Sequence, residues 1–318
     1  MIEATNLTKT YGAKTAVDDI SFNVQPGMVT GFLGPNGAGK STTMRMIVGL
    51  DRPTRGTVTV NGRAYTQHAS PLTEVGALLE AKAVHTGRSA VNHLRAVAAT
   101  HGFGRRRVDE VIEMTGLVTV AGTRVGGFSL GMGQRLGLAA ALLGDPQTLI
   151  LDEPVNGLDP EGVLWVRTLL RELAGQGRTV FLSSHLMSEM ALTADHILVI
   201  GRGRIIADAS VADIIARSSG TTVLVRSPDA DRLVALLRGP DVTCTPIEPG
   251  AVEVSGTTAQ VIGEAAAAAG LVLHELAPRR GSLEDSYMSL TADAVEYHSA
   301  PRAVTSAGQP ATEKEQVR

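Results

Sequence analysis

Hydrophobic and polar residues alternate in one early part of the chain, and short runs of mostly hydrophobic residues follow later. Ile20–Val24 places an apolar side chain at every second position, which is typical of a strand, and Ile2–Leu7 is expected to lie antiparallel to it. Three later runs are short and mostly apolar, which favours buried strands: Met28–Leu33, Thr148–Leu151 and Thr179–Ser183. The change of pattern predicts an antiparallel subdomain followed by a parallel sheet.

Helical spacing lies between and after these strands. Residues 82–124 place apolar side chains at the helical period and are expected to begin an inserted helical subdomain that reaches about residue 145. Asn61-Gly62 is typical of a type I′ hairpin turn. The later elements are a helix at Pro160–Ala174 and a hairpin of His196–Ile200 with Arg204–Ala207. The predicted fold class is α/β, with a parallel sheet flanked by helices, an antiparallel β subdomain and a helical subdomain.

The pattern continues beyond residue 219 as a smaller α+β unit. Its predicted order is strand, helix, strand, strand, helix, strand, at residues 221–227, 229–239, 242–247, 251–255, 258–270 and 271–276. This order predicts a ferredoxin-like domain over residues 220–293. Ser282 and Asp285 give the last helix a start like a capping box. Residues 294–318 are polar and are expected to be a disordered tail.

Composition narrows the class of protein. A chain of 318 residues favours two domains, and 43% hydrophobic residues are enough for packed cores. The net charge of −3 argues against nucleic acid as a partner. The single cysteine, Cys244, excludes a disulfide within the chain. No apolar run approaches the roughly 20 residues that span a bilayer, and the first residues lack the features of a signal peptide. A role at a membrane would therefore need a separate anchor.

A phosphate-binding loop follows the strand Met28–Leu33. The sequence GPNGAGKST places Gly34, Gly39, Lys40 and Ser41 at the spacing G-x-x-x-x-G-K-[ST], and a predicted helix ends near Gly49. Backbone N–H groups and the positive helix end suit phosphates, Lys40 would reach the β- and γ-phosphates, and Ser41 would bind Mg²⁺. The alternative is a glycine turn that matches by chance, without a reason for the strand–loop–helix order.

Two acidic residues follow the strand Thr148–Leu151. Asp152 and Glu153 lie at its carboxyl end, where ligands collect in open α/β sheets. Asp152 is placed to hold Mg²⁺, directly or through water, and Glu153 to polarise the attacking water. The alternative, a solvated acidic turn, leaves the P-loop without a metal partner. The two motifs together predict a site that hydrolyses a nucleoside triphosphate.

Gly126–Gly137 (GGFSLGMGQRLG) contains five glycines just before a helix, and this segment decides between families. Its core, FSLGMGQR, resembles the signature motif of ATP-binding cassette (ABC) ATPases. Further motifs match in the same order: Ser129 and Gly131 in the signature, Tyr11 as the aromatic that stacks on adenine, Asp159 in the D-loop and His185 as the switch histidine. The P-loop positions of this family also include Asn36, Gly37 and Thr42. The resemblance covers about residues 1–219.

The resemblance implies an assembly of two chains. In the family's fold the signature loop lies too far from its own P-loop to touch the same nucleotide. It completes the site of a second copy arranged head to tail, so that two ATP molecules, each with Mg²⁺, lie in the dimer interface. Ser129 would add a hydroxyl donor, and Gly131 leaves room for backbone N–H groups near the γ-phosphate.

The chain departs from the usual family pattern at three positions. Leu130 and Met132 replace the first glycine and the glutamine of L-S-G-G-Q, as in a branch of drug and antibiotic exporters. Glu80 stands where most relatives have a glutamine, and this also resembles bacitracin- and lantibiotic-immunity exporters. Glu80 is a candidate to meet Mg²⁺ or the attacking water, although its negative charge would lie beside phosphates. The alternative is an exposed surface glutamate.

The resemblance implies an ATPase subunit that powers an exporter of a drug, antibiotic or lipid-like compound. Its partner would be a separate ABC-2-type membrane permease, at the cytoplasmic face of the cell membrane, and no nucleic acid is expected. The alternative is a soluble, non-transport ABC ATPase of translation or DNA repair. Translation factors of this kind carry two cassettes and the repair proteins long heptad insertions, whereas this chain has one P-loop and no sustained heptads.

Overall fold

The computed structural model describes residues 1–80, 84–218, 222–279 and 282–291. Its centre is a six-stranded sheet in the order β5-β6-β7-β3-β8-β9, in which every neighbouring pair is parallel except β8 and β9. The strands are β3 (Val29–Leu33), β5 (Val75–Leu78), β6 (Thr148–Leu151), β7 (Thr179–Ser183), β8 (His196–Gly201) and β9 (Arg204–Ser210). The predicted fold class is confirmed.

The central strands are mostly apolar because both faces of the sheet are covered. In β6, Leu149 and Leu151 belong to one hydrophobic cluster and Ile150 to the other, as period-two alternation requires. The second cluster contains three phenylalanine rings, Phe22, Phe32 and Phe181, with centroids 5.2–6.2 Å apart. These rings join the central sheet to the smaller sheet below it.

The smaller sheet is antiparallel, in the order β2-β1-β4, and contains β1 (Ile2–Tyr11), β2 (Lys14–Val24) and β4 (Arg55–Val60). Asn61 and Gly62 both have positive φ, as a type I′ turn requires. The predicted hairpin turn is confirmed, since Val60 and Arg63 exchange backbone hydrogen bonds of 2.8 and 3.1 Å in a single antiparallel bridge. The chain then leaves the sheet, in which β4 pairs with β1.

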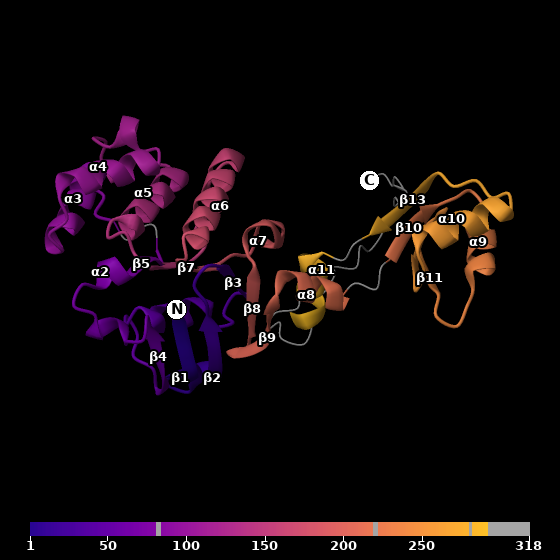
Figure 1. Ribbon diagram of the computed structural model, residues 1–318, viewed down its shortest axis with the longest axis horizontal. Helices are drawn as coiled ribbons and strands as arrows, with labels where there is room; N and C mark the ends of the chain where they lie inside the picture. The colour runs from indigo at the N-terminus through magenta and orange to yellow at the C-terminus, as the bar shows by residue number, and fades with distance from the viewer. Residues whose placement is uncertain (81–83, 219–221, 280–281, 292–318) are drawn as a thin grey trace, which may run out of the picture.

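Seven helices surround these sheets in residues 1–80 and 84–193. They are α1 (Lys40–Ile47), α2 (Pro71–Glu74), α3 (Ala90–Thr100), α4 (Arg105–Met114), α5 (Leu130–Leu142), α6 (Pro160–Gly175) and α7 (Met187–Thr193). Figure 1 shows α3, α4 and α5 gathered at one end, as expected for a helical subdomain, although residues 82–83 lie outside the described ranges. Among the residues that the structure describes, no helix combines the length and apolarity needed to cross a bilayer.

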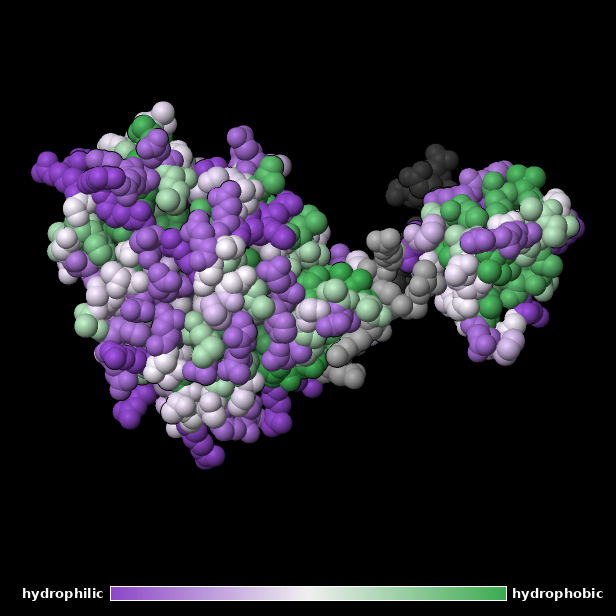
Figure 2. Space-filling model, in the orientation of Figure 1, coloured by the Kyte–Doolittle hydropathy of each residue, from purple (hydrophilic) through white to green (hydrophobic). Residues whose placement is uncertain are grey.

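Residues 222–279, the smaller unit, form a four-stranded antiparallel sheet in the order β11-β12-β10-β13. Its elements are β10 (Thr222–Arg226), α9 (Ala230–Leu237), β11 (Thr243–Glu248), β12 (Ala251–Ser255), α10 (Ala259–Ala268) and β13 (Glu275–Arg279). The order and connections are those of a ferredoxin-like fold. Hydrophobic residues are frequent on the face of this unit seen in Figure 2, and Leu236 and Val261 are exposed side chains of α9 and α10.

The last predicted strand, at residues 271–276, begins four residues and ends three residues before the observed strand β13 (Glu275–Arg279). Leu271 is buried in the core of the smaller unit, and the ladder begins only at Glu275, opposite Arg226. Pairing with β10 sets the register here, and it selects a strand that begins and ends with a charged residue. The apolar run that suggested a strand supplies a core contact instead.

Two further helices complete the larger unit, which consists of residues 1–218 and 282–291. These are α8 (Val211–Ser218) and α11 (Leu283–Thr291), and they pack against each other. Leu283 and Tyr287 of α11 belong to the main hydrophobic cluster of the larger unit, so α11 is not part of the smaller unit in which the sequence placed it. The predicted boundary at residues 219–220 and the predicted tail at 294–318 lie outside the described residues.

Candidate active site

The loop between β3 and α1 needs glycine at two of its positions for lack of space. A Cβ atom on Gly34 would overlap the carbonyl oxygen of Ile200. Gly39 has φ +112°, and a Cβ there would lie 2.7 Å from the carbonyl oxygen of Ala16. The loop is thereby held close to β8 and β2. The P-loop geometry follows from close packing rather than from flexibility.

Lys40 begins α1 and is buried, with 8% of its surface exposed. Its Nζ donates to the carbonyl oxygens of Gly34, at 2.5 Å, and of Pro35, at 3.2 Å. Burial lowers the pKa of Lys40, while the negative charges of Glu153 and Asp152 act in the opposite direction. The ammonium group is therefore held inside the loop, where the phosphates of a nucleotide would bind.

Asp152 connects the P-loop to the end of the sheet. The Ser41 hydroxyl donates to Asp152 Oδ2 at 2.6 Å, although the two residues are 111 positions apart. Ser183 donates to the other carboxylate oxygen, and register explains its place: Leu151 pairs with Leu182, so the next residues of β6 and β7 are neighbours. Hydroxyl and carboxylate oxygens are the ligands that Mg²⁺ prefers, so Ser41 and Asp152 fit this metal.

Glu153 is fixed through both its backbone and its side chain. Its φ is +52°, in the left-handed region that glycine favours. Its N–H donates to Ser183 Oγ at 3.0 Å, and its carbonyl oxygen accepts from Gln134 Nε2 at 2.6 Å and from the Asn156 N–H at 3.2 Å. His185 Nδ1 lies 2.7 Å from Glu153 Oε2. Strained backbone of this kind is concentrated at functional positions.

From the sequence, no function was assigned to Ser183 or Gln134. In the structure Ser183 accepts from the N–H of Glu153, and Gln134 donates to its carbonyl oxygen. Ser183 was foreseeable, because a polar residue at the end of β7 lies beside the end of β6 in a parallel sheet. Gln134 matches a residue of the signature motif, but the resemblance gave its side chain no role, because its partner is a backbone carbonyl.

Tyr11 lies in a second cluster beside α1. Its hydroxyl donates to Asp51 Oδ2 at 2.9 Å, and Arg45 Nε lies 2.8 Å from the same oxygen. The ring is half exposed, with Lys9 Nζ 4.9 Å from its centroid. Thr42, also predicted to contact nucleotide, interacts with the Tyr11 hydroxyl. An exposed ring fixed at its hydroxyl end is a suitable platform for a planar base.

Ser129, Gly131 and Asp159 lie in a third cluster. Ser129 caps α5 by accepting, at 3.2 Å, from the N–H three residues on, and Asp159 caps α6 in the same way at 2.9 Å. A Cβ on Gly131 would lie 3.0 Å from the carbonyl oxygen of Gly157. Within the described ranges, neither Ser129 nor Asp159 hydrogen bonds to the P-loop. One chain therefore brings the signature and the D-loop into contact without a hydrogen bond from Ser129 or Asp159 to the P-loop.

Glu80 follows β5 and is exposed. Its charge acts on Arg45 of α1, and in the part of the chain that the structure describes it makes no hydrogen bond to Ser41 or Asp152. Its predicted role at the metal therefore remains a prediction.

Asn36 and Gly37 form the exposed tip of the P-loop, with φ +83° at Gly37. They border a hollow of about 150 Å³ whose lining includes Lys14 and Arg202. Two cationic side chains thus stand beside the loop, which suits an anionic ligand.

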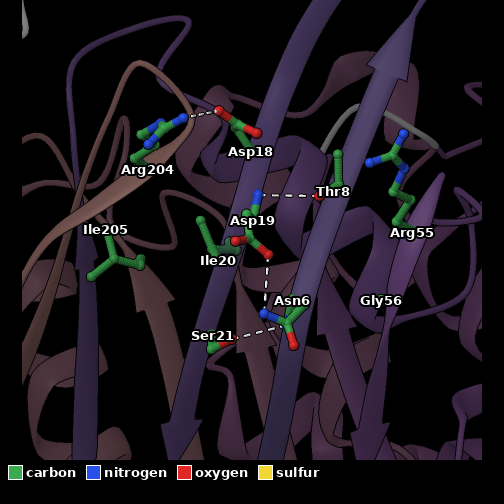
Figure 3. A pocket seen from close by; sticks show the side chains of 10 residues that line it. All are labelled: Asn6, Thr8, Asp18, Asp19, Ile20, Ser21, Arg55, Gly56, Arg204 and Ile205. Carbon is green, nitrogen blue, oxygen red and sulfur yellow. Dashed lines mark hydrogen bonds and ion pairs between the residues drawn. The ribbon is translucent and has the colours of Figure 1, made fainter.

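A larger hollow, of about 740 Å³, lies on the antiparallel sheet and is drawn in Figure 3. Several of its polar groups are paired with one another: Asn6 Nδ2 donates to Asp19 at 3.0 Å, the Asp19 N–H donates to Thr8 Oγ1 at 3.1 Å, and Arg204 contacts Asp18 at 2.6 Å. None of the predicted site residues lines it. The hollow is therefore separate from the candidate active site.

Comparison with known proteins agrees with this geometry. The ABC transporter family model matches residues 17–156, and a family described only as a domain of unknown function matches residues 221–284. The chain is 43% identical to the ABC transporter ATP-binding protein YhcH of Bacillus subtilis, over 67% of this chain and 71% of that protein. It is 33% identical to the bacitracin transport ATP-binding protein BcrA of Enterococcus faecalis, over 91% of this chain and 96% of that protein.

A solved structure supports the fold. The dimeric structure of MJ0796, a bacterial ABC transporter cassette, superposes with a TM-score of 0.62 at 23% identity, over 66% of this chain and 99% of that one. The similarity to BcrA extends over nearly the whole of both proteins, smaller unit included. The chain therefore belongs to the family of ATP-hydrolysing, ATP-binding subunits of ABC transporters.

Proposed function

We propose that this chain binds Mg²⁺ and ATP at the P-loop and uses hydrolysis to power an exporter of an antibiotic-like compound. The observation that carries the proposal is the hydrogen bond between Ser41 and Asp152, 2.6 Å long. It brings the hydroxyl of the P-loop and the carboxylate of β6 to one point, and both are oxygen ligands for Mg²⁺. The bound metal would neutralise charge on the phosphates during transfer.

The side chains around this point have separate roles. Lys40 is expected to exchange its two carbonyl partners for phosphate oxygens, which are stronger acceptors for an ammonium group. Glu153 would accept a proton from the attacking water. His185 Nδ1, 2.7 Å from the Glu153 carboxylate, would orient that carboxylate and contact the γ-phosphate. Asn36, Gly37 and Thr42 would contact the nucleotide around the loop, and Tyr11 would stack on the adenine.

The nucleotide is proposed to lie between two copies of the chain, arranged head to tail. Ser129 has no hydrogen bond to the P-loop of its own chain, and it is exposed at the start of α5, as its N-cap. A helix N-terminus of this kind attracts anions. In the dimer Ser129 and Gly131 would complete the partner's ATP site, with Asp159 at the same interface.

The transport role rests on the similarity to a bacitracin transport ATP-binding protein over 91% of this chain. We propose that a separate ABC-2-type permease carries the compound and that the chain acts at the cytoplasmic face of the membrane. Glu80 would lie where the central sheet meets the helical subdomain, and would pass the state of the nucleotide to that subdomain.

The test is a pair of variants of the full chain. Glu153→Gln removes the proton acceptor but keeps the shape, so it should bind ATP while hydrolysis falls at least ~10²-fold. It should also trap a dimer in the presence of ATP, detected by size-exclusion chromatography. Lys40→Ala, the comparison variant, should lose ATP binding itself. Near-normal turnover of Glu153→Gln would contradict the assigned role.

Mixing two inactive chains tests the shared site. Lys40→Ala and Ser129→Arg should each be poorly active alone. Their heterodimer retains one site with an intact P-loop from one chain and an intact signature from the other, so mixing should restore part of the activity. A wild-type chain that never associates with itself when ATP and the permease are present would contradict the dimer.

A further inference from the structure

The first two turns of α5 pack against residues 153–157, the segment that follows β6. The side chain of Leu130 lies directly over Gly157, so closely that a Cβ there would overlap it. One residue on, Gly131 faces the carbonyl oxygen of Gly157. One turn further, Gln134 Nε2 donates to the carbonyl oxygen of Glu153 at 2.6 Å. The signature helix and residues 153–157 are therefore in contact at three successive points.

Gln134 makes the contact that reaches the reaction site. Its side chain is 4% exposed, and a buried amide without a partner would cost stability, so the bond to Glu153 is well determined. Glu153 has a left-handed φ of +52°, a conformation that a non-glycine residue adopts only when its surroundings impose it. Ser183 holds the N–H of this residue, and Gln134 and the Asn156 N–H hold its carbonyl.

We propose that Gln134 is a positioning residue that fixes the Glu153 carboxylate and couples the two ATP sites of the dimer. This rests on the proposed function. In a head-to-tail dimer, the signature of one chain touches the partner's ATP, whereas Glu153 acts on ATP held by its own P-loop. The bond from α5 to Glu153 therefore links the two sites within each chain. A shift of α5 on engaging the partner's ATP moves the carbonyl of Glu153 and, with it, the carboxylate.

A double-mutant cycle in the full-length chain tests the positioning. Gln134→Met keeps the volume and removes the donor, so kcat should fall about 10- to 100-fold, the effect of a small misplacement of a reacting group. The KM for ATP should stay within about twofold, because no contact with ATP is lost. In the Glu153→Gln background, where the carboxylate is already absent, Gln134→Met should cause no further loss in single-turnover assays. Gln134→Leu serves as a second variant without the donor.

A matched control separates positioning from general loosening. Thr115 is also a fully buried polar residue in the helical subdomain, and its hydroxyl donates to the carbonyl oxygen of Val111 at 2.7 Å. Thr115→Val removes a comparable side-chain bond that does not involve Glu153, and it should leave kcat near the wild-type value at a similar loss of thermal stability. An equal fall in kcat for Thr115→Val would overturn the inference.

Mixed dimers locate the effect. With Ser129→Arg in one chain and Lys40→Ala in the other, the working site uses the P-loop and Glu153 of the Ser129→Arg chain. Gln134→Met should reduce activity when added to that chain and have little effect in the Lys40→Ala chain. The reverse pattern would show that Gln134 serves the signature loop and would overturn the inference.

The homodimer measurements separate the two proposals. If the wild-type chain hydrolyses ATP and Gln134→Met has an unchanged kcat, the positioning role of Gln134 is refuted and the proposed function stands. A wild-type chain that binds no ATP refutes the proposed function itself.

Discussion

Replacing Gly157 with alanine adds one methyl group at a position with two separate obstacles. The backbone has φ +76°, in the region that residues with a Cβ rarely adopt. The added Cβ would also overlap Cδ2 of Leu130 and lie 2.5 Å from its Cγ. The second obstacle exists because this chain has leucine where the signature motif usually has glycine. Gly157→Ala therefore measures how tightly the signature loop and the D-loop are packed.

The two costs can be estimated separately. A left-handed backbone costs alanine about 1–2 kcal/mol. Overpacking against Leu130 adds about 1–3 kcal/mol. The free energy of unfolding should therefore fall by about 2–5 kcal/mol in Gly157→Ala. Leu130 is 48% exposed, so Leu130→Ala alone should cost little, and in the double variant it should restore the overpacking part.

Urea unfolding followed by the fluorescence of Trp165 is a suitable assay. This tryptophan is the only one in the chain and lies in α6, so it reports the larger unit. Gly177→Ala is the control, since Gly177 has φ +89° but open space around a Cβ, and only the backbone cost applies. The reasoning is refuted if Gly157→Ala costs no more than Gly177→Ala, or if Leu130→Ala fails to restore stability.

Three further predictions concern other parts of the chain. Tyr11→Ala should weaken ATP binding about tenfold by calorimetry, since stacking on a base contributes about 1–3 kcal/mol, and Tyr11→Phe should keep most of it. Glu80→Ala should leave ATP affinity nearly unchanged but impair transport in vesicles. Normal transport by this variant would show that Glu80 is a surface glutamate without a role in coupling. Hydrogen bonds from Ser282 lower the pKa of Asp285, so the stability that they add is present above the ordinary carboxyl pKa and lost as pH falls through the lowered value. Ser282→Ala should reduce stability by about 1 kcal/mol at neutral pH and weaken this acid dependence in thermal unfolding.

Strand periodicity predicted the sheets well wherever both the pattern and the pairing partner favoured the same residues. Thr179–Ser183 and Ala251–Ser255 begin and end where expected, since each is a short apolar run with a neighbour on both sides. The strand expected at 271–276 was displaced because its pairing with β10, and not its hydrophobicity, sets its position. The place of α11 was missed for a similar reason, since nothing local tells which unit a helix will cover.

In the candidate site, too, the features that depend on local sequence were predicted, and those that depend on tertiary contacts were not all foreseen. The P-loop was predictable from adjacent residues, because its geometry depends on a local turn into a helix. The meeting of Ser41 with Asp152 was expected from the two motifs taken together, whereas the strand order that produces it comes only from the structure. Gln134 was not foreseen, since it acts on a carbonyl group that every residue possesses. The exposed Glu80 is still a prediction, because its surroundings do not distinguish a metal ligand from a surface charge.

The position of α11 has a consequence for the order in which the chain folds during synthesis. The larger unit needs Leu283 and Tyr287 for its core, yet these residues leave the ribosome after the whole smaller unit. At about 5–20 residues per second, residues 219–281 take roughly 3–13 s to translate. During that time α8 lacks its partner and its apolar face stays open to water or to a chaperone. The smaller unit is thus an insertion that can fold first. The core of the larger unit is completed only after α11, which follows the smaller unit, has been translated.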